Sequence, residues 1–372
     1  MNRQPGKAAV GWGYGDSIMA TIPTLPGVTS LRVPTTRLTQ HVLVAGPADG
    51  TPVLLVHGNA SSATFWEEVM TELPPRFRAI APDLRGYGAT DDELIDATRG
   101  VADWVDDLLA LKTALGIGKY HVAGHSLGGA VLWGLVAADE ADIVSATFVA
   151  PGSPYGFGGT HGADGRPNYP DYAGSGGGLV NPEMVARMTA GDRSTDNPSA
   201  PRNVMNAMYW KPPFRSEREE DLLSSMLSEK MGPQRYPGDA VPSSNWPGAA
   251  PGVHGPINAI SAKYVGDTVE RFVAAAPKPR LLWVWGADDQ IVSDTSLSEV
   301  GYLGKLGYVP GWPGEEVYPP QPMITQTRAV LDRYAAAGGT YREARFEDTG
   351  HTPYLEQPER FMREFLEQLG DE

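Results

Sequence analysis

The stretch Tyr120-His121-Val122-Ala123-Gly124-His125-Ser126-Leu127-Gly128-Gly129 decides how this chain folds. Its first residues, 120–123, form a short apolar run typical of a buried strand, and a helix is expected to begin near Leu127. Gly124 and Gly128 stand two residues before and after Ser126. Glycines there let the helix pack closely on the strand while the serine occupies a strained turn. The stretch therefore predicts a strand, a sharp turn and a helix, with Ser126 as a nucleophile at the helix N-terminus.

Other apolar runs indicate further interior strands. They cover residues 52–56, 77–81, 146–150 and 281–285, and a strand-like segment follows at 341–346. Residues 31–45 alternate loosely, as a pair of strands would, and 101–115 has apolar residues at helical spacing. Strands that alternate with helices predict an α/β fold with a mostly parallel central sheet covered by helices. Active sites on such sheets lie at the carboxyl ends of the strands.

The length of 372 residues favours one large core with a sizeable insertion over two independent domains. Between about 154 and 276 the sequence changes to loops rich in glycine and proline with short helical pieces. We therefore expect a core formed by residues 1–153 and 277–372, with an inserted cap or lid at 154–276. A second glycine-rich stretch, 293–321, is interpreted as an extra loop within the core.

Composition excludes several classes of function. A net charge of -15, from 45 acidic and 30 basic side chains, would repel nucleic acid. No apolar run is long enough to span a membrane, so we expect a soluble protein without a membrane partner. The absence of cysteine removes disulfides, thiolate metal sites and a cysteine nucleophile. The start lacks the apolar core of a signal peptide, which predicts a cytoplasmic location. We expect a small-molecule substrate, no cofactor and no metal.

A serine nucleophile needs a base and an acid, and the chain offers both after later strands. Of seven histidines, six fall in strands, beside the proposed site or in the cap, which leaves His351 in the loop after 341–346. The acid should follow 281–285, where Asp288 and Asp289 are adjacent. A carboxylate there would fix the imidazole tautomer, but the pattern alone does not say which aspartate points inward.

An oxyanion hole is predicted beside Ser126. The run 52–56 ends in His57-Gly58-Asn59, so backbone N–H groups after this strand can face the cavity. We assign the hole to the N–H groups of Asn59 and Leu127. The alternative is that the Asn59 side chain simply holds a loop. Four aromatic side chains, which are otherwise core or loop residues, are candidates for an apolar substrate pocket: Tyr155, Phe157, Trp246 and Tyr354.

Taken together, these motifs resemble the α/β-hydrolase superfamily over residues 31–153 and 279–369. The resemblance rests on His57-Gly58, Asp83-Leu84-Arg85-Gly86-Tyr87-Gly88, the turn at Ser126, Gly286 to Val292 and Gly350-His351. In the family's pattern the acid falls on Asp289, which makes Asp288 the second choice. The segment 57–66 is similar to haloalkane dehalogenases, but those enzymes use aspartate where this chain has Ser126. The family usually places its histidine sooner after the acid, so 293–321 must loop out.

The resemblance implies a serine hydrolase that cleaves a carboxylic ester or lactone through an acyl-enzyme on Ser126. Two alternatives use the same three residues: an amidase or prolyl-type aminopeptidase, and a carbon–carbon bond hydrolase. A third belongs to a different class, a small-ligand receptor that has lost turnover. Fold analogy does not separate them. The intact set Ser126, Asp289 and His351 argues against the receptor.

Overall fold

The computed structural model describes residues 22–370, and its centre is an eight-stranded sheet. Its strands are β1 (Val28–Pro34), β2 (Thr39–Ala45), β3 (Thr51–Val56), β4 (Phe77–Pro82), β5 (Tyr120–His125), β6 (Ile143–Val149), β11 (Arg280–Gly286) and β12 (Thr340–Phe346). Their order across the sheet is β1-β2-β4-β3-β5-β6-β11-β12. β2 pairs antiparallel with both β1 and β4, and all other neighbours are parallel. The fold class predicted from the sequence is confirmed.

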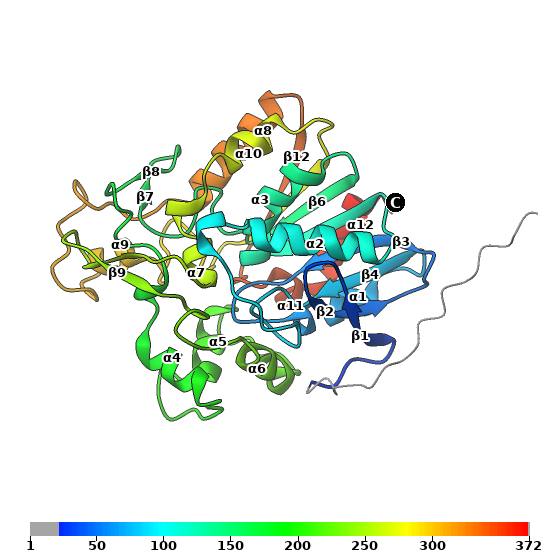
Figure 1. The fold of residues 1–372 in the computed structure, drawn as a ribbon, viewed down its shortest axis with the longest axis horizontal. Coiled ribbons are helices and arrows are strands. Elements are labelled where there is room, and N and C mark those ends of the chain that lie inside the picture. Colours follow the sequence, from blue (N-terminus) through cyan, green and yellow to red (C-terminus); the bar gives the residue numbers. More distant parts are fainter. Residues whose placement is uncertain (1–21, 371–372) are drawn as a thin grey trace, which may run out of the picture.

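Helices cover both faces of this sheet. One face carries α2 (Ala102–Ala114), α3 (Leu127–Asp139), α8 (Thr268–Ala274) and α10 (Met323–Ala336), and the other carries α1 (Glu67–Glu72), α11 (Pro353–Glu356) and α12 (Pro358–Leu369). In Figure 1, α2 and α3 cross in front of the sheet and α12 lies behind it. Every residue of β5 is buried, because a parallel strand covered on both faces has no solvent side. The interior runs of the sequence are therefore apolar throughout.

Residues 154–276, here called the inserted segment, connect β6 to β11. Before α8 the segment forms two small hairpins and four short helices: β7 (Thr160–His161), β8 (Arg166–Pro167), α4 (Pro182–Thr189), α5 (Pro201–Met208), α6 (Glu219–Leu227), β9 (Ala240–Pro242), β10 (Ala249–Pro251) and α7 (Pro256–Ala259). Much of it lies to the left of and below the sheet in Figure 1, where it adjoins α9 (Val300–Lys305). We call residues 293–321, which contain α9, the second insertion.

The last helix of the inserted segment packs on the core. α8 lies within residues 154–276, the range expected for the cap, but its Phe272 packs edge-on to Trp133 of α3, with ring centroids 4.8 Å apart. The same ring lies 6.0 Å from that of Phe148 in β6. Two buried apolar residues on one side of a short helix, Val269 and Phe272, give it a core face. The helical layer of the core therefore begins before residue 277.

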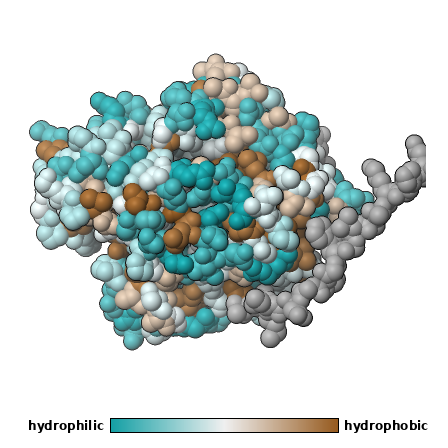
Figure 2. Space-filling view, in the orientation of Figure 1, coloured by the Kyte–Doolittle hydropathy of each residue, from teal (hydrophilic) through white to brown (hydrophobic). Residues whose placement is uncertain are grey.

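The face drawn in Figure 2 is mainly hydrophilic, and its apolar residues form small separate patches. Within residues 22–370, no helix combines the length and the apolar character that crossing a bilayer requires.

Candidate active site

Ser126 occupies the turn between β5 and α3 in a backbone conformation that non-glycine residues rarely adopt. Its φ is 55° and its ψ is -115°. Such a conformation persists only where the surroundings enforce it. The Ser126 N–H donates to the carbonyl of Val149 over 2.9 Å, and its own carbonyl accepts from the N–H groups of Ala130 and Gly152 over 2.9 and 3.0 Å. The end of β6, the loop after it and the first turn of α3 therefore hold the turn at Ser126 in place.

The two glycines of the motif are required by close packing. A Cβ on Gly124 would lie 2.5 Å from the carbonyl oxygen of Gly128, and one on Gly128 would lie 2.3 Å from that of Val56. Both distances are too short for any side chain. The spacing of the motif thus reflects the contact between α3, β5 and the end of β3, and it brings the chain after β3 beside Ser126.

His351 and Asp289 meet although they lie far apart in the sequence. His351 follows β12, Asp289 follows β11, and the imidazole Nδ1 lies 2.7 Å from the Asp289 Oδ2. Both side chains are buried. The other carboxylate oxygen accepts from the N–H groups of Ile291 and Val292 over 2.7 and 3.0 Å. Because a carboxylate only accepts, Nδ1 carries the imidazole proton, and Nε2 is left free to receive another.

The neighbouring aspartate points elsewhere. The Asp288 side chain is 40% exposed, and its Oδ2 lies 2.9 Å from the Nζ of Lys211 in the inserted segment. The same ammonium group lies 2.9 Å from the Oδ1 of Asp348. Asp288 therefore takes part in a surface ion pair, and Asp289 is the residue placed against the imidazole.

Ser126 and His351 line one cavity of about 350 Å³. Asn59 and Leu127 line it too, so four of the residues proposed from the sequence for catalysis and the oxyanion hole come together. The Ser126 hydroxyl makes no hydrogen bond to His351 within the described part of the chain. In enzymes without substrate this hydrogen bond is often long and shortens in the complex.

The N–H groups of Asn59 and Leu127 are free to bind an anion. Neither donates a hydrogen bond to any residue between 22 and 370. Leu127 is the first residue of α3, where the helix dipole favours negative charge. Gly58 lies so close to Ser126 that a Cβ on the glycine would come within 3.0 Å of the serine Cβ. The Asn59 side chain does hold its loop, as the alternative interpretation suggested, because the Tyr87 hydroxyl donates to its Oδ1 over 2.9 Å.

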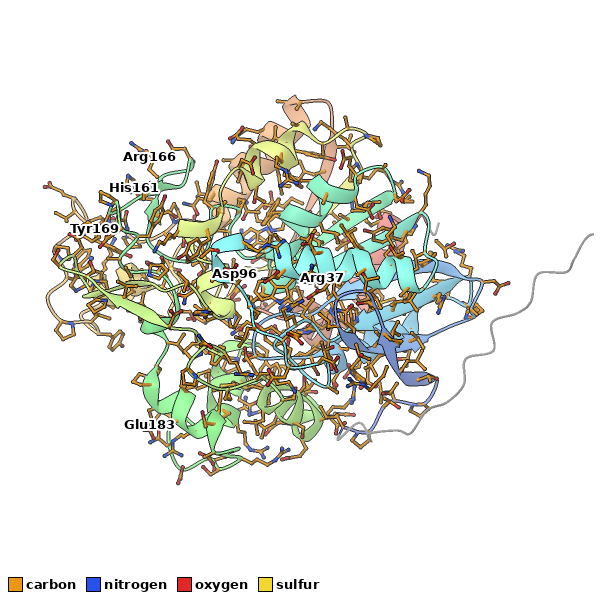
Figure 3. All side chains as sticks on the ribbon, in the orientation of Figure 1. Arg37, Asp96, His161, Arg166, Tyr169 and Glu183 are labelled. Carbon is orange, nitrogen blue, oxygen red and sulfur yellow. The ribbon has the colours of Figure 1, made fainter. Side chains whose placement is uncertain are left out.

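The other histidines have structural partners. The His57 Nε2 accepts from the N–H of Leu84 over 2.9 Å, and burial lowers the pKa of His57. Burial also lowers the pKa of His125 well below its usual value, and its Nε2 donates to the His351 carbonyl over 2.8 Å. His161 lies on the peripheral β7–β8 hairpin (Figure 3), 2.7 Å from the side chain of Asn168. These contacts leave His351 as the histidine at the cavity that has a carboxylate partner.

A second Ser–His–Asp series exists outside the cavity. The Ser30 hydroxyl lies 2.8 Å from the His41 Nε2, and the His41 Nδ1 lies 2.7 Å from the Asp83 Oδ2. Ser30 is exposed on the edge strand β1 and does not line the cavity. This series has the three side chains of a catalytic triad, but its serine does not line the cavity, which makes it a useful internal control.

Asp83 anchors the loops behind the site. Its Oδ1 accepts from the N–H of Ala63 and its Oδ2 from the N–H of Ala89, each over 2.8 Å. Burial alone would raise the pKa of Asp83, but the hydrogen bond and charge of His41, the charge of His57 and the Ala63 N–H lower it to about 2. The ionised carboxylate therefore ties the segment after β3 to the segment after β4.

We expect Asp83 to contribute stability that is lost in acid. Its folded pKa lies below the unfolded value, so the contribution is present above pH 4 and disappears as the pH falls toward 2. The pH-dependent part should be about 2 kcal/mol. Urea unfolding of wild type and Asp83→Asn between pH 6 and pH 2.5 measures it. A difference in unfolding free energy that stays constant over this range would contradict the prediction.

Of the four aromatic residues expected at the pocket, Phe157 lines the cavity and the other three do not. The Tyr155 hydroxyl faces Arg333 at 3.4 Å, and the Trp246 Nε1 donates to the Pro310 carbonyl over 2.9 Å. Tyr354 is buried and stacks on Trp66, with ring centroids 4.5 Å apart. Each of these three has core or loop contacts that the sequence pattern did not distinguish from pocket contacts.

Aliphatic side chains are the largest class in the cavity wall. Met184, Val204 and Met208 come from the inserted segment, and Val300 and Leu303 come from the second insertion. Sequence reasoning missed them, although one signal was available. Val204 and Met208 are four residues apart on a short amphipathic helix, which places them on one face.

Within residues 22–370, no group of three or more histidine, aspartate or glutamate side chains is arranged so that it could hold a metal ion.

Known proteins share parts of this sequence. The chain is 37% identical over 110 residues to RutD of Variovorax paradoxus, provisionally named a carbamate hydrolase, and the match covers 29% of this chain and 41% of that protein. It is 37% identical over 118 residues to the AB hydrolase superfamily protein YfhM of Bacillus subtilis, covering 30% and 40% of the two chains. The matched stretches thus span about two fifths of these curated relatives.

Solved structures share the fold over most of the chain. A 2-hydroxy-6-oxo-6-phenylhexa-2,4-dienoate hydrolase of Rhodococcus superposes with a TM-score of 0.57 at 18% identity, covering 92% of this chain and 99% of that one. The esterase RhEst1, also of Rhodococcus, gives 0.55 at 19% identity, covering 92% and 98%. The model of the alpha/beta hydrolase family matches residues 53–364. From this match, which spans most of the sequence, we conclude that the chain belongs to the alpha/beta hydrolase family.

Proposed function

We propose that this chain is a serine hydrolase that cleaves a carboxylic ester or lactone through an acyl-enzyme on Ser126. One observation supports this most directly. A serine on a strained turn faces the same cavity as a histidine whose Nδ1 lies 2.7 Å from a buried aspartate. This is the arrangement that activates a serine hydroxyl at neutral pH.

In the proposed mechanism, the Ser126 Oγ attacks the substrate carbonyl carbon while its proton passes to the His351 Nε2. Asp289 stabilises the resulting imidazolium, and the N–H groups of Asn59 and Leu127 bind the oxyanion. Collapse of this intermediate breaks the bond to the alcohol oxygen, which takes the proton from His351. Water then attacks the acyl-enzyme in the same way, giving the acid and restoring Ser126.

The cavity wall favours an uncharged substrate with an apolar group. No lysine or arginine lines the cavity, and Glu299 is the one acidic residue in its wall within the described part of the chain. Glu299 is 1% exposed and caps α9, because its two carboxyl oxygens accept from the N–H groups of Gly301 and Tyr302 over 2.9 and 2.8 Å. A charged substrate would lose its hydration in this cavity without gaining an ion pair.

The lack of a free charged side chain in the described cavity wall weighs against two alternatives. The first alternative is a carbon–carbon bond hydrolase. The Rhodococcus hydrolase acts on a dienoate, as its name states, and no cation in the described wall of this chain's cavity would pair with such a carboxylate. A prolyl-type aminopeptidase would need a free carboxylate for the substrate ammonium group, and Glu299 is already occupied. The receptor alternative has no feature of its own in its favour, because all three triad residues are present.

We infer that the inserted segment forms the cap of this site and sets its specificity together with the second insertion. Residues from both line the cavity. A cytoplasmic location stays a prediction from the sequence.

We expect the enzyme to discriminate against negative charge on the acyl chain. p-Nitrophenyl butyrate should be hydrolysed with a kcat/KM about 100-fold higher than mono-p-nitrophenyl succinate, since an unpaired buried charge costs several kcal/mol. Met208→Arg, which adds a cation to the wall, should narrow this ratio, and Met208→Gln serves as the uncharged control. Similar turnover of both esters by wild type would contradict the proposed substrate class.

A further inference from the structure

The mechanism above leaves one buried carboxyl group unused, that of Glu229. This residue follows α6 in the inserted segment and is 4% exposed. Neither of its carboxyl oxygens makes a hydrogen bond of normal geometry to a described residue. The next residue fixes its position on the core. The Lys230 N–H donates to the carbonyl of Gly86 over 2.9 Å, and the Lys230 Nζ donates to that of Gly88 over 2.8 Å.

Glu229 lies behind the loop that carries the proposed oxyanion donor. The Tyr87 hydroxyl and the Ala60 N–H face its carboxyl group. Tyr87 also donates to the Asn59 Oδ1 over 2.9 Å. From the inserted segment, the Tyr209 hydroxyl donates to the carbonyl of Ala60 over 2.9 Å. Tyr87 and Tyr209 therefore hold the Asn59–Ala60 turn, in which Ala60 has a φ of 43°, from behind, and Glu229 lies beside Tyr87.

The surroundings of Glu229 favour its neutral form. The titratable groups that face it are the hydroxyls of Tyr87, Tyr209 and Tyr236, which come from three different segments and are all buried. None of them is a cation. Burial raises the pKa of Glu229 well above its usual value, against the weaker opposite effects of Tyr87 and the Ala60 N–H.

We propose that Glu229 is a positioning residue for the oxyanion hole. The Tyr87 hydroxyl has one proton, which it donates to Asn59, so only the protonated form of the Glu229 carboxyl group can add a hydrogen bond to the Tyr87 oxygen without taking that proton away. The Asn59 N–H is thereby held toward the cavity. A carboxylate at this place would instead accept the Tyr87 proton and draw it away from Asn59. Because Glu229 belongs to the inserted segment, seating of that segment and formation of the hole are coupled. This inference rests on the proposed function.

The first test compares kcat and KM for p-nitrophenyl butyrate. Glu229→Leu should lower kcat about 10- to 100-fold and change KM by less than about threefold, because the hole acts mainly in the transition state. Glu229→Gln, which can still donate to Tyr87, should restore most of kcat. Tyr87→Phe should resemble Glu229→Leu, and the double variant should lose no more than either single variant. If Glu229→Leu does not fold, Tyr87→Phe supplies the measurement.

Ser225→Ala is the matched control for seating of the inserted segment. Ser225 lies four residues before Glu229, and its hydroxyl lies 2.6 Å from that of Ser62, so the variant removes a buried contact between the inserted segment and the core that does not involve Asn59 or Tyr87. It should keep kcat near wild type. A loss of kcat in Ser225→Ala equal to that in Glu229→Leu, or a Glu229→Gln variant as poor as Glu229→Leu, would overturn the proposal.

The second test does not depend on activity. With its folded pKa above the unfolded value, Glu229 keeps a proton that the unfolded chain loses, so stability falls as pH rises above the unfolded pKa. Relative to Glu229→Gln, the unfolding equilibrium constant of wild type should rise as the pH rises above the unfolded pKa, by up to about tenfold per pH unit. If the ratio of the two unfolding equilibrium constants does not change with pH, Glu229 is not neutral in the folded protein, and the proposal is overturned. Wild type that neither hydrolyses esters nor reacts with a phosphonate would instead refute the proposed function itself.

Discussion

Ser126→Ala is expected to lower kcat for short p-nitrophenyl esters by a factor on the order of 10⁵ and to abolish covalent labelling by an activated phosphonate. The reason is that the Ser126 hydroxyl is the proposed attacking group, and no other side chain takes its place on the strained turn. Intact-mass measurement of wild type should find one phosphonate adduct per chain, and peptide mapping should place it on Ser126.

The second Ser–His–Asp series supplies the control for this experiment. Ser30 is hydrogen-bonded to His41, which faces Asp83, yet Ser30 lies on an exposed edge strand outside the cavity. Ser30→Ala should keep both the labelling and the turnover of wild type. An adduct on Ser30 would show that hydrogen bonding alone, and not the cavity, selects the nucleophile. Either that adduct or wild-type turnover by Ser126→Ala would overturn the proposal.

Asp289→Asn is expected to lower kcat by about 10⁴, while Asp288→Asn should stay within about threefold of wild type. An asparagine at 289 can still accept from the N–H groups of Ile291 and Val292, but its amide would turn toward the His351 Nδ1 and favour the wrong imidazole tautomer. Asp288 only forms a partly exposed ion pair with Lys211. Steady-state kinetics on both variants give the comparison.

Thermal unfolding of the two aspartate variants should accompany the kinetics. Both are expected to remain folded, so that a loss of turnover in Asp289→Asn reflects the tautomer rather than the fold. The opposite pattern, with the larger loss in Asp288→Asn, would move the acid by one residue and would separate function from the 2.7 Å contact seen here.

The sheet and the positions of the proposed triad were predictable for a common physical reason. Buried parallel strands are apolar throughout, so β3, β5 and β11 stand out in the sequence. Polar residues that directly follow such strands must meet at one edge of the sheet. The loops after β11 and β12 follow this rule, so the adjacent Asp288 and Asp289, together with His351, were expected at that edge. The choice of Asp289 came from the resemblance to the family's pattern.

The cavity wall and the role of Glu229 were not predictable in the same way. The wall is formed by short helices and loops of the two insertions, whose positions depend on tertiary contacts and not on periodicity. Glu229 follows α6 in a stretch that also contains Lys230 and Arg235, a composition typical of an exposed loop. Only the structure shows that its carboxyl group is buried among tyrosines. The packing of α8 on the core was missed because a seven-residue helix carries too few apolar positions to reveal which surface it covers.

The origin of the cavity wall has an evolutionary consequence. Chemistry is assigned to residues at the ends of sheet strands, whereas Met184, Val204, Met208, Val300 and Leu303 belong to connections outside the sheet. Mutations in those connections can therefore change which molecules are accepted while the strands that fix the reacting groups remain untouched. Homologous chains can therefore diverge in substrate range while they keep the same catalytic residues.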